Sequence, residues 1–135
     1  MKKQSGFTFV ELLVVITIIG IIFAAGIVSF AAITKRSRDV RRKADLEGIR
    51  QSLEICRSLT GAYPDLQYVY QSDVTSSALS CGGAGPTMMS KTPSDPSPCT
   101  AAANGAYNYQ KTSTTTYELS ATCMEIDTGY LVTNP

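Results

Sequence analysis

The stretch that decides the fold is GFTFVELLVVITIIGIIFAAGIVSFAAI, residues 6–33. Its section from Leu12 to Ile33 contains 22 residues and no charged side chain. As a helix that rises about 1.5 Å per residue, this section is about 33 Å long, which is enough to cross the hydrocarbon core of a bilayer. The sequence therefore predicts a membrane-spanning helix near the N-terminus.

The length of 135 residues is typical of a single domain. Positive and negative charges are concentrated in different segments of the chain. The formal net charge is +1, but residues 34–57 sum to +4 and residues 58–135 sum to −4. The apolar segment is thus followed by a basic stem and then by an acidic head.

Histidine and cysteine usage restricts the chemistry. No histidine is present, which excludes imidazole general bases, serine–histidine triads and histidine metal sites. We expect no enzymatic activity, no catalytic residue, no cofactor and no metal. The cysteines form no Cys-x-x-Cys pair, and two disulfides in an oxidising compartment fit them best; they are Cys56, Cys81, Cys99 and Cys123.

Glu11 is an unusual residue for a membrane segment, because an unpaired acid there is costly. A secretory signal peptide does not explain it, since the apolar run is too long and lacks an Ala-x-Ala cleavage site. A plain anchor also leaves it unpaired. A cut after Gly6 would create a free amine on Phe7, four residues before Glu11, and so would supply a cation.

These residues resemble the class III signal of type IV pilins and type II secretion pseudopilins: a short basic leader ending at Gly6, an aromatic Phe7, Glu11 and an apolar helix. The resemblance implies that prepilin peptidase cleaves between Gly6 and Phe7 and that Phe7 is N-methylated. It also implies that Glu11 neutralises the Phe7 amine of a neighbouring subunit during assembly.

The resemblance further implies the partners and the location. The partners are other pilins in a helical homo-oligomeric filament, prepilin peptidase, an inner-membrane assembly platform and, before assembly, membrane lipid. The chain would cross the cytoplasmic membrane once and then enter an extracellular filament or a periplasmic pseudopilus. Six basic residues between Lys35 and Lys43 oppose this orientation, because they outnumber Lys2 and Lys3. We give more weight to the leader and to the disulfide-type cysteines.

The helical pattern continues beyond the apolar segment as one stripe of Leu46, Ile49, Leu53 and Cys56. No proline interrupts residues 7–60, and Gly61 and Pro64 then supply a helix stop. We expect the glycines inside the helix to mark close helix packing. The basic residues of the stem are expected to be solvated and partly paired with acids on the same helix, and nucleic acid is not an expected partner.

The head is predicted to be loop-rich and then to form a small sheet. Residues 61–104 should contain little regular structure, with a turn at Gly82–Gly85. Residues 106–110 and 116–123 read as a hairpin, and residues 130–133 as a third strand. Tyr117, Leu119, Ala121 and Cys123 should face the stem.

The predicted fold is therefore α+β and pilin-like, with a long N-terminal helix packed against a small antiparallel sheet. The expected segments are the leader 1–6, the membrane and assembly helix 7–33, the amphipathic stem 34–60, the αβ-loop 61–104 and the sheet region 105–135. The disulfide pairing stays open: Cys123 should lie near Cys56, but the sequential pairs Cys56–Cys81 and Cys99–Cys123 are equally plausible.

The function predicted is a structural subunit of a type IV pilus-like filament. A secretion pseudopilin is the first alternative. It is less favoured because major pseudopilins end in an acidic calcium loop, whereas only Glu125 and Asp127 occur in the last residues here. A membrane-tethered adhesin outside any filament is the second alternative.

Overall fold

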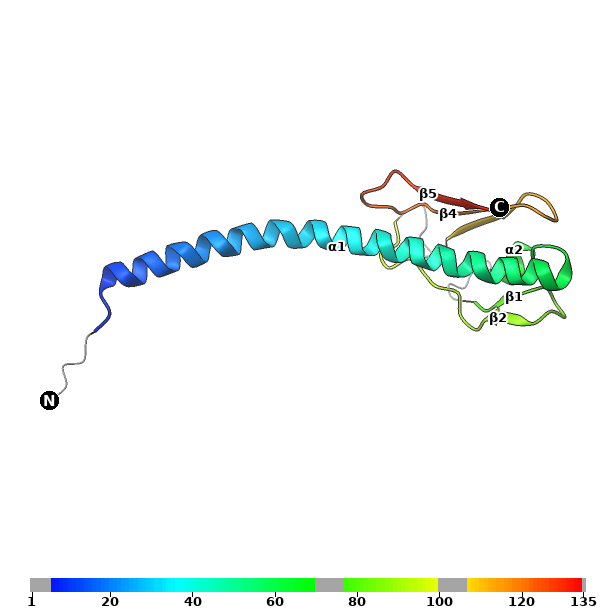
Figure 1. Ribbon diagram of the computed structural model, residues 1–135, viewed down its shortest axis with the longest axis horizontal. Coiled ribbons are helices and arrows are strands. Elements are labelled where there is room, and N and C mark those ends of the chain that lie inside the picture. Colours follow the sequence, from blue (N-terminus) through cyan, green and yellow to red (C-terminus); the bar gives the residue numbers. More distant parts are fainter. Residues whose placement is uncertain (1–5, 70–76, 100–106, 135) are drawn as a thin grey trace. The chain divides into compact units, whose positions relative to one another are not determined.

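The computed structural model describes residues 6–69, 77–99 and 107–134, and the chain divides into two compact units, residues 1–35 and 36–135 (Figure 1). One helix, α1, runs from Phe9 to Thr60 and belongs to both units. It begins two residues later than predicted, because Thr8 caps its N-terminus. The long helix followed by small antiparallel sheets confirms the predicted α+β class.

In the first unit, the large apolar side chains of α1 are exposed. Phe9, Ile21 and Phe30 are each more than 70% exposed, and nothing in the described part of the unit covers them. By length and composition alone, α1 is the one helix among the described residues that is suited to crossing a membrane.

The second unit has its own hydrophobic core, which the stripe on α1 builds together with the sheet. The predicted stripe is confirmed, since Leu46, Ile49, Leu53 and Cys56 are all fully buried. They share one cluster with Tyr117, Leu119 and Ala121 of the sheet, which is the face predicted to lie on the stem. Burial of this kind is worth about 25 cal/mol for each Å² of apolar surface, so this unit can stabilise itself.

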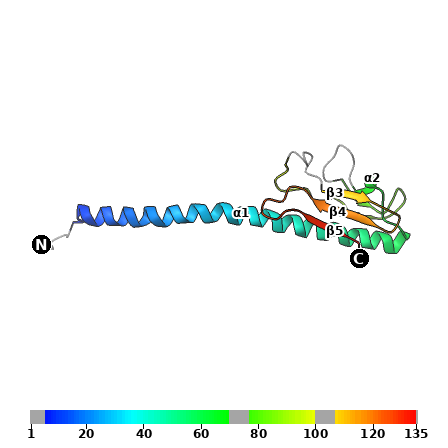
Figure 2. The same cartoon turned by 90° about the horizontal axis from the view of Figure 1, so that it is seen from above.

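The sheet consists of β3 (Asn108–Lys111), β4 (Tyr117–Ala121) and β5 (Tyr130–Thr133), antiparallel and in that order. Figure 2 shows it lying along the second part of α1. The hairpin and the third strand are confirmed, although β4 ends at Ala121, short of the predicted Cys123. The predicted start of the first strand at residue 106 lies outside the described residues.

The segment between helix and sheet holds three short elements, α2 (Leu66–Val69), β1 (Leu79–Ser80) and β2 (Thr87–Met89). The helix stop is built as expected: Gly61 has φ of 80°, and its N–H donates to the Arg57 carbonyl at 2.8 Å. The predicted turn closes with a 3.0 Å bond from the Gly85 N–H to the Gly82 carbonyl.

The disulfides are sequential, Cys56–Cys81 and Cys99–Cys123. Cys123 is buried, as expected, but the β1–β2 hairpin brings Cys81 to Cys56, and Cys123 joins the segment that leads toward β3. Each bond closes a loop of similar length, with sequence separations of 25 and 24 residues.

Candidate functional site

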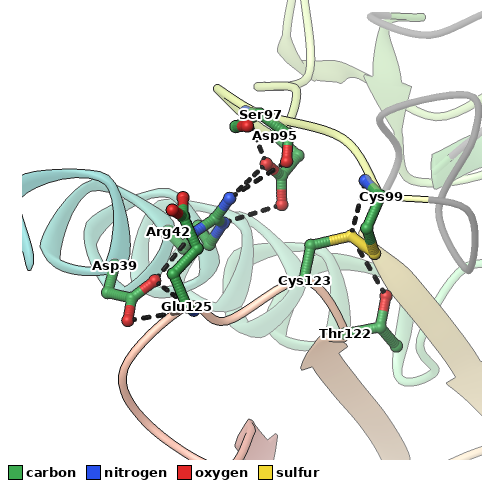
Figure 3. The surroundings of a disulfide bond; sticks show 8 residues. All are labelled: Asp39, Arg42, Asp95, Ser97, Cys99, Thr122, Cys123 and Glu125. Carbon is green, nitrogen blue, oxygen red and sulfur yellow. Dashed lines mark hydrogen bonds and ion pairs between the residues drawn. A yellow bond between two sulfur atoms is a disulfide. The ribbon is translucent and has the colours of Figure 1, made fainter. Parts of the chain in front are cut away.

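Arg42 is the most deeply buried charged residue among the described residues of the second unit, with a fully buried side chain. Its Nε and Nη2 donate to the two carboxylate oxygens of Asp95, each at 2.8 Å, which is the bidentate geometry of a strong ion pair. Its Nη1 donates to Asp39 at 2.6 Å, and Nη2 also reaches the carbonyl of Ser97 at 3.1 Å. Figure 3 shows this cluster beside the Cys99–Cys123 disulfide. The bond to Asp95 raises the pKa of the guanidinium, so Arg42 stays charged.

Asp39 connects the same cluster to the segment that follows β4. Its carboxylate accepts the backbone N–H groups of Glu125 and Ile126 at 3.0 and 2.8 Å. Burial raises the pKa of Asp39, but the backbone donors and Arg42 outweigh it, and the pKa is lowered overall. One carboxylate on α1 therefore fixes the direction of the chain after the last disulfide.

Two further ion pairs hold that segment. Arg38 binds Glu125 through two contacts, and Lys43 binds Asp127. The Arg38 contact lowers the pKa of Glu125, and the Asp127 contact raises the pKa of Lys43. Both pairs are at least partly exposed, so each contributes little free energy alone.

The expectation of a solvated stem paired with its own acids is wrong for half of the basic residues between Lys35 and Lys43. Arg42 does pair with Asp39 on its own helix, but its bidentate partner Asp95 is 53 residues away, and Arg38 and Lys43 pair with acids more than 80 residues away. Sequence reasoning missed these pairs because the interleaved acids Asp39, Asp45 and Glu47 lie within helical reach of most of these bases. The Pro-x-Asp-Pro sequence at residues 93–96 was the available signal, since it positions the buried Asp95.

The described residues contain no group of three or more histidine, cysteine, aspartate or glutamate side chains arranged to hold a metal ion. The three carboxylates that do converge, those of Asp39, Asp95 and Glu125, surround Arg42. The guanidinium occupies the position where such a cluster would otherwise require a cation.

At the other end of the chain, Thr8 and Glu11 form a closed pair of hydrogen bonds at the start of α1. The Thr8 N–H and hydroxyl donate to Glu11 Oε2 at 2.9 and 2.7 Å, and the Glu11 N–H meets the Thr8 hydroxyl oxygen at 3.3 Å. This is a capping box, which satisfies backbone donors that a helix start leaves unpaired. Glu11 therefore has a partner within its own chain. The Thr-x-x-Glu spacing could have revealed it from the sequence.

Gly6 and Phe7, the residues flanking the predicted cut, lie immediately before this cap. Neither belongs to the helix, and the Phe7 side chain is 84% exposed. The basic leader residues Lys2 and Lys3 lie outside the described residues. The chain thus presents an accessible Gly–Phe bond, then an acid, then an uncovered apolar helix.

Residues 1–27 match the family model of the prokaryotic N-terminal methylation motif. This motif is the class III signal of type IV pilins and pseudopilins, and the predicted resemblance is confirmed to that extent. The motif contains the Gly–Phe bond, the capping box and the first turns of α1. Together with the long apolar helix, it fits a single-pass membrane anchor.

The methylation motif ends within α1, so it says nothing of residues 28–135. Comparison with curated proteins and with solved structures gives no match. The specific role of the head has to be argued from its own geometry.

Proposed function

We propose that this chain is a structural subunit of a type IV pilus-like filament, cleaved after Gly6 and polymerised through α1. The observation that carries the proposal is Glu11 in the first turn of an exposed apolar helix, within a methylation motif. An apolar helix of this length needs either lipid or neighbouring helices around it. An acid at the start of the helix then sets how neighbouring helices align along the filament, because a buried Glu11 is most stable where it meets a cation.

The cation in this proposal is the Phe7 amine of the next subunit, which is released by prepilin peptidase and then methylated. Before assembly, Glu11 is held by Thr8, which lowers the cost of keeping it in lipid. In the filament, the amine adds a charged partner. The step from membrane to filament therefore gains an ion pair in a medium of low dielectric.

The features of the second unit support a head outside the cytoplasm. Its four cysteines form two disulfides, which persist in oxidising compartments. Three of the six basic residues that argue against this orientation, Arg38, Arg42 and Lys43, form ion pairs with Asp95, Glu125 and Asp127 in the folded head. The folded stem thus presents less positive charge to the membrane than the sequence count implies.

The segment after β4 favours a pilus subunit over a secretion pseudopilin. Its two acids are engaged by Arg38 and Lys43, so this segment is held by ion pairs and by the backbone bonds to Asp39. A pseudopilin that relies on calcium would instead keep such oxygens for the ion. An adhesin that acts alone would have no need of Glu11 in its anchor.

The experiment compares Glu11→Gln with wild type in a host that assembles this protein. Glutamine can still accept the Thr8 bonds, so the variant keeps the cap and loses only the charge. We expect normal cleavage after Gly6, seen as the mass of an N-methylated Phe7 peptide, and a large loss of filaments from the sheared surface fraction. The matched control is Glu47→Gln, which removes a surface carboxylate paired with Arg50.

Three results would contradict the proposal. An intact Met1, or a cut near Ala25 or Ala32, would remove the prepilin route. Wild-type protein that stays entirely with the membrane after shearing would favour the lone adhesin. Normal filament yield from Glu11→Gln would leave a pilin-type subunit but remove the pairing with the amine.

A further inference from the structure

A groove of about 350 Å³ lies between α1 and the segment that follows β2. On the helix side it is lined by Arg41, Asp45 and Gly48, and on the other side by Met89, Lys91 and Ser94. All of these residues belong to the second unit, so the groove is a feature of the head itself.

Two cations and one acid line the groove, so its formal side-chain charge is +1. Asp45, its only acidic lining residue, already accepts the Tyr107 hydroxyl at 2.7 Å. Arg41 and Lys91 are exposed and bind no acid within the described part of the chain. Two cations that line a groove and form no ion pair with an acid of the described residues favour an anionic occupant.

A further charge without a partner is Glu118 on β4. Every other carboxylate in the described residues accepts at least one hydrogen bond, whereas Glu118 accepts none; the partnered acids are Glu11, Asp39, Asp45, Glu47, Glu54, Asp65, Asp95, Glu125 and Asp127. Its side chain is exposed. The one unpaired acid and the two unpaired groove cations, within the described residues, thus belong to the same head.

Glu118 does not reach the groove of its own chain. Its neighbours Tyr117 and Leu119 point into the core toward α1, so Glu118 points away from the helix on the outer face of the sheet. Figure 1 shows the sheet and the β1–β2 hairpin on opposite sides of the second part of α1. A protein partner for Glu118 in this groove would therefore belong to another molecule.

We propose that Glu118 of one subunit docks in the Arg41–Lys91 groove of the next, and that this contact joins neighbouring heads in the filament. The contact is heterologous, because two different surfaces of the same chain meet. Heterologous contacts propagate into rings or helical filaments, whereas two-fold contacts stop at dimers. The inference rests on the proposed function and adds to it a second interface, on the heads.

Gly48 gives an independent way to close the groove. A Cβ built at this position would meet no atom within 4 Å, so the space above it is open. The predicted close helix packing at Gly48 is therefore not seen within a single chain, and it stays a prediction for the assembled protein. A larger residue at position 48 should raise helix propensity while it fills the groove.

The experiment uses the full chain in an assembling host and reads filament yield in the sheared fraction. The first variant, Glu118→Lys, has a cation on the sheet and an unchanged groove. The second, Arg41→Glu/Lys91→Glu, has an acidic groove and an unchanged Glu118. Each alone brings like charges together, and we expect a fall of at least about tenfold.

Co-expression of these two variants is the decisive arm. The cation that the first variant carries on β4 matches the acidic groove of the second, and Glu118 of the second matches the basic groove of the first. We expect the mixture to form copolymers that contain both variants, identified by mass, with a yield close to that of wild type. A merely structural defect in either variant would not be repaired in this way.

The controls separate the groove from general charge and folding effects. Lys35→Glu/Arg36→Glu reverses two exposed cations outside the groove, and Gln67→Lys adds a cation elsewhere on the head; both should assemble normally. Gly48→Gln should lose filaments and Gly48→Ala should not, although both should unfold at or above the wild-type temperature. All variants should retain two disulfides.

Each remaining outcome is informative. Normal yield from Glu118→Lys and from the groove variant would overturn the inference and leave the proposed function intact. Loss from the groove variant alone would overturn the pairing with Glu118 and assign the groove to a different acidic partner. Failure of the mixture would show that the two surfaces do not meet. Absence of filaments from wild type would instead remove the proposed function itself.

Discussion

The two units of this protein differ in where their apolar side chains lie: the head buries many of them, and the N-terminal unit exposes them. Among the described residues, every buried hydrophobic side chain lies at residue 46 or later, whereas residues 7–33 hold most of the large exposed ones. The head carries a core, two disulfides and a buried ion cluster. The N-terminal unit is stabilised mainly by its capping box and by its helical backbone bonds.

This difference predicts where the effects of mutation will appear. Substitutions in the head should change its free energy of unfolding, because the interactions that stabilise it are within the chain. Substitutions in the N-terminal unit should change insertion or assembly instead, because lipid or neighbouring subunits supply its missing contacts. The following predictions test that division, from the largest expected effect to the smallest.

Arg42→Met should produce the largest loss of head stability, about 3–5 kcal/mol. The reason is that Asp39 and Asp95, both buried, would lose the cation that compensates them. The measurement is chemical unfolding of the detergent-solubilised chain, followed by tyrosine fluorescence. The matched variant Arg42→Met/Asp39→Asn/Asp95→Asn removes the orphaned charges and should recover part of the loss. An unchanged midpoint for Arg42→Met would show that the cluster does not stabilise the head.

Removing either disulfide by paired serine substitution should cost about 2–4 kcal/mol. We expect Cys56→Ser/Cys81→Ser to cost more than Cys99→Ser/Cys123→Ser, although the loops are similar in length. Cys56 is fully buried in the core cluster, so a hydroxyl there would lie in an apolar site. The same unfolding assay ranks the two pairs. If loss of Cys99–Cys123 cost more, the Cys56–Cys81 bond at the β1–β2 hairpin would contribute less to the stability of the head than expected.

The features that could be predicted from the sequence are those with a local period. The stripe on α1 follows the helical repeat, and the inner face of β4 follows the alternation of a strand, so Leu53 and Leu119 could be placed in the core. The Thr8–Glu11 cap also has a local signature, the Thr-x-x-Glu spacing, although this spacing alone does not separate a cap from a partner in another subunit. Local patterns therefore predict the core faces of α1 and β4, and they also indicate the cap at the start of α1.

The ion cluster and the disulfide pairing could not be predicted, because both depend on contacts between distant segments. Charge alone makes Arg42 resemble Arg41, one residue earlier, yet one is fully buried and the other exposed. Successive residues of a helix point in different directions, and Arg42 is the one that points toward Asp95 and Ser97. Residues 92–94 also line the groove together with α1, and no sequence motif predicts that groove.

Acid should weaken the head through its carboxylates. The pKa of Asp39 and that of Glu125 are lowered in the folded state, so their contribution is present above the unfolded values near 3.8 and 4.5 and is lost as the pH falls below them. We expect the melting temperature to be constant from pH 7 to about pH 5 and to fall below about pH 4. Asp39→Asn should start lower and show a flatter pH profile. A melting temperature that rises on acidification would contradict the role of the cluster.

The smallest effect is expected for Thr8→Ala, because it removes a cap from a helix start that has almost no other contact. Loss of such a cap costs about 0.5–2 kcal/mol, and here the cost should remain local to the first turn. Amide hydrogen exchange in micelles should become faster at Glu11, whose N–H bonds the Thr8 hydroxyl, and should be unchanged at Leu53 and Leu119 in the head. Thr8→Ser keeps the hydroxyl and should behave as wild type. Faster exchange in the head of Thr8→Ala would mean that the two units are energetically coupled through α1, and the division of effects between them would then fail.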